Sequence, residues 1–190
     1  MKSLKLILLF VVVTIAISSC NKNADFLIEK GRVGKLTKNT TVENLSNVFV
    51  KDSLVIHLSK IEKSIGNEKK YFHEDDEYIV YNKKGKHLLT ITPLKQRDSL
   101  STIKSIEIFN NKYKTKKGIS LYSPYKDISA AYPISITNTL LSAHIDIDEL
   151  NATMSIDKKE IGINEFNRDK IKADQIPDLA RIKHFTIWFN

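Results

Sequence analysis

Cys20 has the most distinctive chemistry in this chain, because it is the single cysteine among 190 residues. A lone thiol cannot form a disulfide within the chain, so its position in the sequence is the feature that indicates its role. It follows two small residues, Ser18 and Ser19, at the end of an apolar run over 6–17. Small neighbours leave the thiol and the backbone accessible to a modifying enzyme. This arrangement indicates covalent modification at Cys20.

The apolar run over 6–17 is typical of an export signal. Its 12 residues reach roughly 18 Å as a helix, well short of the roughly 30 Å hydrocarbon core that a spanning helix crosses. Lys2 and Lys5 give the preceding segment its positive charge, as in secretory signals. We therefore expect residues 1–19 to be removed, which makes Cys20 the first mature residue. The alternative is an ordinary secretory signal followed by an unmodified thiol.

The segment Ile17-Ser18-Ser19-Cys20 resembles the lipobox of bacterial lipoproteins, in which an aliphatic residue and two small residues precede the acylated cysteine. Ile17 replaces the commoner leucine. The resemblance implies that Cys20 carries diacylglycerol and a further chain such as palmitate, and two or more chains hold a protein stably on a bilayer. We expect a cell-envelope protein anchored at the outer membrane, with residues 20–30 as lipidated cysteine and tether. The side that the domain faces stays open.

The other polar residues form no catalytic or metal-binding motif. The acidic run 73–77 supplies an imidazole and four carboxylates, but consecutive residues leading into a strand point to alternate sides, so we expect a solvated loop. Asp146, Asp148 and Asn151 lack the glycine and terminal glutamate of a calcium loop, and no Gly-x-Ser-x-Gly motif occurs. We therefore expect no catalytic residue, no metal and no cofactor. The histidines also lack paired metal-ligand spacing; they are His57, His73, His87, His144 and His184.

The basic residues exceed the acidic ones, with a net charge of +8 for the whole chain. Without Lys2 and Lys5, 28 basic residues remain against 22 acidic ones. No nucleic-acid-binding motif accompanies them, so we expect no nucleic-acid partner. Two basic runs, 83–86 and 112–117, are typical of solvated turns. If they share one face, they can meet bilayer phosphates or an acidic partner.

Two short helices are predicted from their start signals. The first begins at Thr40, since Thr40 and Glu43 have the spacing of a capping box. The second begins at Ser123 and Pro124 and ends at Pro133.

Strand-like segments follow each predicted helix. The first set is a hairpin, with 78–81 and 87–92 flanking the turn 82–86. The second set alternates apolar and polar residues over 143–147 and 152–156. Each half ends in a similar strand, 103–109 and 182–188, with three of seven positions identical. The shared order predicts an internal duplication, with one repeat over 31–115 and another over 116–190.

This order predicts an α+β fold in which two helix-plus-strand repeats form an antiparallel sheet with the helices on one face. At the level of pattern, the mature chain is similar to tandem-repeat envelope proteins of the β-lactamase inhibitor protein type. We expect a non-catalytic binding module that engages an envelope protein or a glycan. Tyr122, Tyr125 and Tyr132 are candidates for its exposed patch. The alternatives are a carrier of a lipid or other apolar ligand, and a hydrolytic enzyme.

Overall fold

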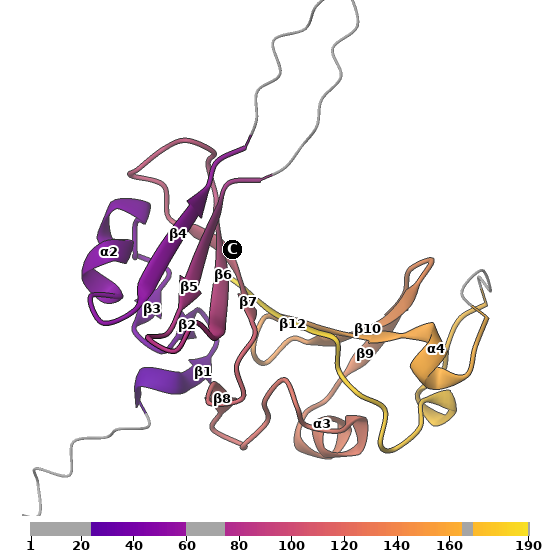
Figure 1. Cartoon of the computed structure of the whole chain (residues 1–190). Coiled ribbons are helices and arrows are strands. Elements are labelled where there is room, and N and C mark those ends of the chain that lie inside the picture. Colours follow the sequence, from indigo (N-terminus) through magenta and orange to yellow (C-terminus); the bar gives the residue numbers. More distant parts are fainter. Residues whose placement is uncertain (1–23, 60–74, 165–168, 190) are drawn as a thin grey trace, which may run out of the picture.

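The computed structural model describes residues 24–59, 75–164 and 169–189, which form a mixed α+β fold that is mostly β (Figure 1). The leader, Cys20 and His73 lie outside the described residues. No helix within the described ranges has both the length and the apolar character needed to cross a membrane.

The main element is an eight-stranded sheet in which every neighbouring pair is antiparallel. Its strand order is β4-β5-β6-β7-β12-β11-β10-β9. The sheet therefore consists of two four-stranded meanders whose last strands, β7 and β12, pair in the middle. The bounds are β4 Ser53–His57, β5 Glu77–Tyr81, β6 His87–Pro93, β7 Ile103–Ile108, β9 Ser135–Asn138, β10 Ser142–Ile147, β11 Ala152–Asp157 and β12 His184–Trp188.

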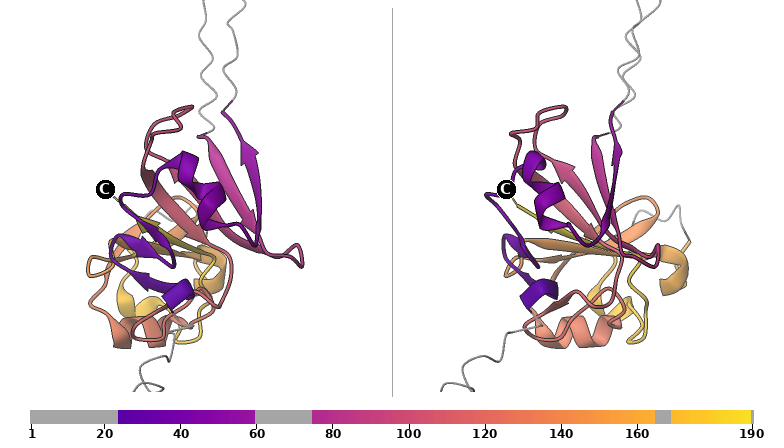
Figure 2. Two further views of the ribbon diagram at one scale, coloured as in Figure 1. Left: turned by 90° about the vertical axis from the view of Figure 1, so that its left-hand side faces the viewer. Right: turned by 60° about the vertical axis from the view of Figure 1, so that its left-hand side comes forward.

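A second, smaller sheet has the order β3-β2-β1-β8 and contains one parallel pair, β1 with β8. It lies with α2 beside the first meander, whereas α3 lies beside the second (Figures 1 and 2). The strands are β1 Leu27–Glu29, β2 Arg32–Val33, β3 Leu36–Thr37 and β8 Lys114–Thr115. The helices are η1 Ala24–Phe26, η2 Val42–Asn44, α2 Leu45–Val48, α3 Tyr125–Ala131, α4 Lys158–Ile161 and η3 Ala173–Gln175.

The core follows from the alternation of side chains along the strands. In β10 and β11, Ile145 and Met154 are opposite one another and fully buried, whereas their polar neighbours are mostly half-exposed. The same apolar side continues through Phe185 of β12 and Ile106 of β7. Because successive side chains of a strand point to opposite faces, one side of the sheet meets the core and the other carries the polar residues.

Both predicted hairpins are confirmed, because β5 pairs with β6 and β10 pairs with β11 around the expected turns. The similar terminal segments are also confirmed as strands, β7 and β12. The second helix is confirmed as α3, which ends before Pro133 as predicted, but it begins one residue later than expected, at Tyr125, with Pro124 rather than Ser123 as its N-cap residue.

The predicted capping box at Thr40 is wrong. The first helical turn is η2, its N-cap residue is Thr41, and no side chain caps it. The hydroxyl of Thr40 instead accepts a hydrogen bond from the N–H of Thr37 at 3.0 Å, in the turn after β3. This hydroxyl therefore stabilises the preceding turn rather than the helix.

Candidate functional site

The polar side of the eight-stranded sheet, called the open face below, is defined by one row of residues that crosses its central strands. Pairing places these residues opposite one another on neighbouring strands, so they share one side of the sheet. From β10 to β6 the row contains Asp146, Thr153, Thr186, Glu107 and Thr90. Short hydroxyl side chains dominate its middle, which leaves the surface there low and polar.

Aromatic and imidazole rings gather on the open face next to this row. His87 stacks on Phe109 with ring centroids 3.7 Å apart. Tyr81 lies opposite His87 on the neighbouring strand β5, and the centroids of these two rings are 5.2 Å apart. The Nε2 of His87 is 3.2 Å from the carbonyl oxygen of Leu89, which can only accept, so we assign the proton to Nε2. Burial lowers the pKa of His87, and this ring is therefore neutral at pH 7.

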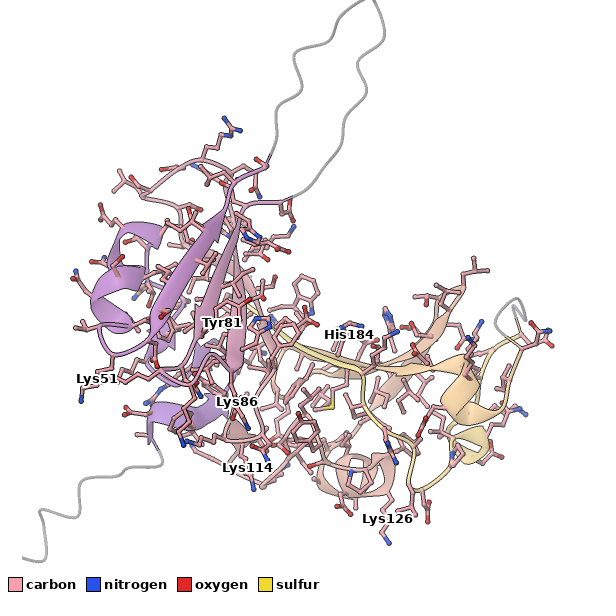
Figure 3. All side chains as sticks on the ribbon, in the orientation of Figure 1. Lys51, Tyr81, Lys86, Lys114, Lys126 and His184 are labelled. Atoms are coloured by element: carbon pink, nitrogen blue, oxygen red, sulfur yellow. The ribbon has the colours of Figure 1, made fainter. Side chains whose placement is uncertain are left out.

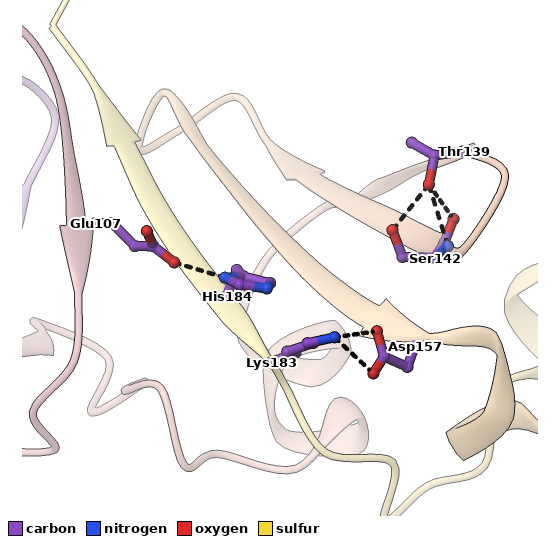
Figure 4. A network of polar contacts seen from close by, with 6 residues as sticks. All are labelled: Glu107, Thr139, Ser142, Asp157, Lys183 and His184. Carbon is purple, nitrogen blue, oxygen red and sulfur yellow. Dashed lines mark hydrogen bonds and ion pairs between the residues drawn. The ribbon is translucent and has the colours of Figure 1, made fainter. Parts of the chain in front are cut away.

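The two meanders are joined on the open face by an acid–imidazole pair. The Nδ1 of His184 on β12 lies 2.6 Å from a carboxylate oxygen of Glu107 on β7 (Figure 4). The side chains of His184 and Glu107 are 51% and 29% exposed, respectively.

Figure 3 places Tyr81 and His184 on the same side of the bent sheet. Trp188 completes the group, and its indole N–H donates to the hydroxyl of Thr153 at 3.1 Å.

The arrangement of His184 and Glu107 has the elements of a general base, since a carboxylate orients the imidazole. Ser155 lies opposite His184 on β11, but no hydrogen bond between their side chains is found in the described part of the chain. The backbone N–H groups in the middle of a sheet are taken by the strand ladder, and an oxyanion needs free donors. Among the described residues, the pair therefore has no hydroxyl group hydrogen-bonded to His184.

The histidines, which have no regular spacing in the sequence, are placed on one face by the sheet but on separate strands. All four within the described residues lie on the open face: His57, His87, His144 and His184. No group of three or more potential metal ligands forms among the described residues. One sequence signal could have indicated that β7 pairs with β12. Both strands alternate polar and apolar residues, with Glu107 and Thr186 on the polar side.

Tyr122, Tyr125 and Tyr132 do not form the expected exposed patch. Tyr125 in the first turn of α3 and Tyr132 at its end are buried, and of the three tyrosines Tyr122 alone is exposed, at 68%. Tyr125 and Tyr132 lie on one side of the helix, and that side packs on the core.

The basic run 83–86 and Lys112, the first residue of the run 112–117, meet at the tip of the β5–β6 hairpin. A pocket of about 480 Å³ there is lined by lysines of both runs and by Lys51. It adjoins a second pocket of about 470 Å³, whose wall also includes apolar side chains.

The prediction of a solvated loop over 73–77 is wrong at Asp76, whereas Asp75 is exposed as expected and residues 73 and 74 lie outside the described residues. Asp76 is fully buried, and its carboxylate accepts hydrogen bonds from the backbone N–H groups of Ser59 and Arg97.

Comparisons with known proteins support the fold. No protein-family model and no curated protein matches the chain. The chain is similar in structure to the uncharacterized protein yfeY from Escherichia coli, with a TM-score of 0.50 and 13% sequence identity. The match covers 85% of this chain and 98% of that one. At this identity, the likeness concerns the arrangement of helices and strands alone.

Proposed function

We propose that this chain is a lipid-anchored lipoprotein of the cell envelope that binds another protein through the open face of its sheet. The observation that carries the proposal is the cluster of partly exposed rings on the open face, next to hydrogen-bonded acidic groups. Tyrosine and tryptophan are frequent among residues that dominate protein interfaces. Tyr81 and Trp188 supply these side chains here.

The open face is rigid, which favours binding. Its side chains project from strands that are paired on both sides, and several are held by their neighbours. Asp146 accepts hydrogen bonds from Thr137 at 3.2 Å and Thr153 at 2.9 Å, and Lys183 contacts Asp157 at 2.9 Å (Figure 4). A surface that is already ordered loses little conformational entropy when a partner binds.

The chemistry of the open face favours a protein segment over a glycan. The rings of His87 and Phe109 stack on one another, which covers one face of each ring. Partly exposed aromatic rings pack well against apolar side chains of a partner. Asp146 has no cationic partner among the described residues. The proposed partner therefore presents an apolar side chain to the rings and a basic side chain to Asp146.

The proposal also includes an internal duplication and the packing of both helices on one side of the sheet. Leu45 of α2 and Ile128 of α3 are buried in one apolar cluster with the core side of both meanders. Helices that pack on the core side leave the opposite side for a partner. Each half also has a left-handed glycine before its helix, Gly34 in the first and Gly118 in the second. These correspondences support two copies of one structural unit.

The proposal is tested by a photoreactive benzoylphenylalanine at position 184 in living cells. His184 is half-exposed and central on the open face, so illumination is expected to give one discrete protein adduct. The same residue placed at 126, on the exposed side of α3, should not give it. Mass spectrometry of the purified chain should find diacylglycerol on Cys20; a bare thiol there contradicts the anchor.

A charge reversal supplies the matched control for the crosslink. Asp146→Lys, combined with the residue at 184, is expected to reduce the adduct by about tenfold, because like charges at an interface repel. Asp178→Lys makes the same charge change at an exposed position away from the sheet and should leave the adduct intact. An adduct that survives Asp146→Lys, or one that forms equally from 126, contradicts the assignment of the open face.

A further inference from the structure

Two neighbouring pockets lie beside the β5–β6 hairpin, one at its tip and the other between the hairpin, η1 and the end of α2, on a part of the molecule that the open face does not include. They share four wall residues, Lys51, Asp52, Asn82 and Lys112. Their volumes of about 470 and 480 Å³ are within the range usual for small-ligand sites, roughly 300–1,000 Å³. We name the two together the hairpin pocket.

Two asparagine-stabilised turns place lysines in the hairpin pocket. The side-chain oxygen of Asn82 accepts from the backbone N–H of Lys84 at 2.8 Å and of Lys86 at 3.1 Å. The side-chain oxygen of Asn110 accepts from the N–H of Lys112 at 3.1 Å. Such side-chain-to-backbone bonds fix the shape of a turn. The lysines of the run 83–86 and Lys112 are therefore held against one pocket by ordered backbone.

The charge of the hairpin pocket is not balanced by the protein. The pocket of about 480 Å³ is the polar half of the hairpin pocket. None of the lysines that line it forms an ion pair in the described part of the chain, where the ion pairs found join acidic groups to other cations. Asp52 is the one acidic residue in the polar half. Lysine ammonium groups gathered in a concave site attract an anion and donate hydrogen bonds to it. The lysines are Lys51, Lys83, Lys84, Lys86 and Lys112.

The other half of the hairpin pocket is partly apolar. Phe26, Phe49 and Leu88 contribute to its wall, as does Tyr113. Burial raises the pKa of Tyr113, with Asp52 and Asp25 acting in the same direction, so its hydroxyl stays neutral. The ammonium of Lys112 lies 5.5 Å from the ring of Phe26, where the two halves meet. An anionic head joined to an apolar tail fits this division.

The start of the folded chain places the hairpin pocket near the anchor. Asp25 and Phe26 line it, and Asp25 is five residues from Cys20. Five residues span at most roughly 18 Å when fully extended. If Cys20 carries acyl chains, as the proposed function holds, the hairpin pocket is kept at the height of the lipid head groups. Figure 3 shows Lys51, Lys86 and Lys114 on the side where the described chain begins, away from Lys126.

The geometry points to binding of an anionic glycerophospholipid, with the phosphate held by the lysines and part of an acyl chain received by the apolar half. Only the position of the hairpin pocket at the bilayer depends on the lipid anchor. The binding chemistry does not depend on it.

The test measures soluble short-chain lipids against the full chain in non-ionic detergent. Lysine side chains are followed by NMR after ¹³C-methylation of their amines. Dihexanoyl phosphatidylglycerol is expected to shift the signals of Lys84 and Lys112. Dihexanoyl phosphatidylcholine has the same chains without net charge, and glycerol phosphate has the charge without chains; each should bind about tenfold more weakly. Because Cys20 plays no part in this measurement, failure here is distinct from failure of the anchor.

Two double variants provide matched controls. Lys84→Ala with Lys112→Ala removes one lysine from each turn and is expected to weaken phosphatidylglycerol binding by about tenfold. Lys126→Ala with Lys170→Ala removes the same charge from exposed positions elsewhere and should leave the affinity unchanged. All four positions are on the surface, and equal melting temperatures confirm folding. Equal loss in both variants, or equal binding of glycerol phosphate and phosphatidylglycerol, overturns the proposal.

Discussion

Asp76 shows how a single buried carboxylate can stabilise a fold by accepting hydrogen bonds from backbone N–H groups. Its two oxygens accept hydrogen bonds from the backbone N–H of Ser59, at 2.7 Å, and of Arg97. The guanidinium of Arg97 also donates to the carbonyl oxygen of Ser59. These bonds tie the segment after β4 to the loop after β6. They also hold Arg97 at a φ of 56°, a conformation unusual for a residue with a side chain.

The pKa of Asp76 determines the pH range in which these bonds stabilise the fold. Burial raises it, but the N–H groups of Arg97 and Ser59 together outweigh burial and lower it below its ordinary value of 3.8. A folded-state pKa below the unfolded one gives stability that is complete above about pH 4 and is lost as the pH falls through the folded value.

We predict that Asp76→Asn lowers the free energy of unfolding by about 1–3 kcal/mol at pH 7, because an amide has one acceptor oxygen for two donors. Urea denaturation at pH 7 and pH 3 measures the effect. The difference from the native chain should shrink at pH 3, below the ordinary pKa of 3.8, because proton uptake by this carboxyl in the unfolded chain already removes part of the stability that the charge provides. A penalty of the same size at both pH values contradicts the assigned role of the charge.

Gly34 determines whether the small sheet can form. It follows β2 with a φ of +57°, and its N–H donates to the carbonyl oxygen of Leu27 at 2.8 Å. A Cβ at this position would lie 2.3 Å from the backbone oxygen of Asp25. That contact involves backbone on both sides, so no side-chain rotation relieves it.

We predict that Gly34→Ala lowers the free energy of unfolding by roughly 2 kcal/mol or more, from the clash and from the left-handed backbone. Gly118→Ala is the matched control. Gly118 also has a positive φ, +83°, but nothing lies within 4 Å of its added Cβ. This control should cost about 1 kcal/mol, the conformational penalty alone. Thermal unfolding of both variants checks the difference, and equal losses would show that the clash is relieved.

The pairing of β7 with β12 makes the two meanders one continuous sheet. Ile106 and Ile187 are opposite each other at this junction, and both are fully buried. Trp188, the single tryptophan, is also part of this junction, where it lies opposite Ser105. Because the apolar cluster runs without a break through both halves, neither meander has a core of its own.

We predict one cooperative unfolding transition for the whole chain. Fluorescence of Trp188 and far-ultraviolet circular dichroism should give the same denaturation midpoint. Ile106→Ala should lower both midpoints together, with a loss of about 2–5 kcal/mol. Leu179→Ala, at a side chain that is 73% exposed, should change neither by a measurable amount. Separate midpoints for the two signals would show that the meanders unfold independently.

The elements that could be predicted are those whose signals are local. The turn residues 82–86, with an alternating strand on each side, gave the β5–β6 hairpin, and the prolines at 124 and 133 framed α3. The short edge strands β4 and β9 were not predicted, because four or five residues carry too little periodicity. Asp76 was placed wrongly, since its donors come from segments 17 and 21 residues away.

Local periods and turn residues therefore established an α+β chain with two hairpins, and the residues around Cys20 established the expectation of an anchor. The tertiary structure alone decided which distant segments became neighbours. It paired β7 with β12, placed the histidines on one face and gathered the lysines of two separate turns around one pocket. Such neighbours depend on closing loops of many residues and on how apolar faces pack together. A pattern read along the chain contains no information on the outcome of that packing.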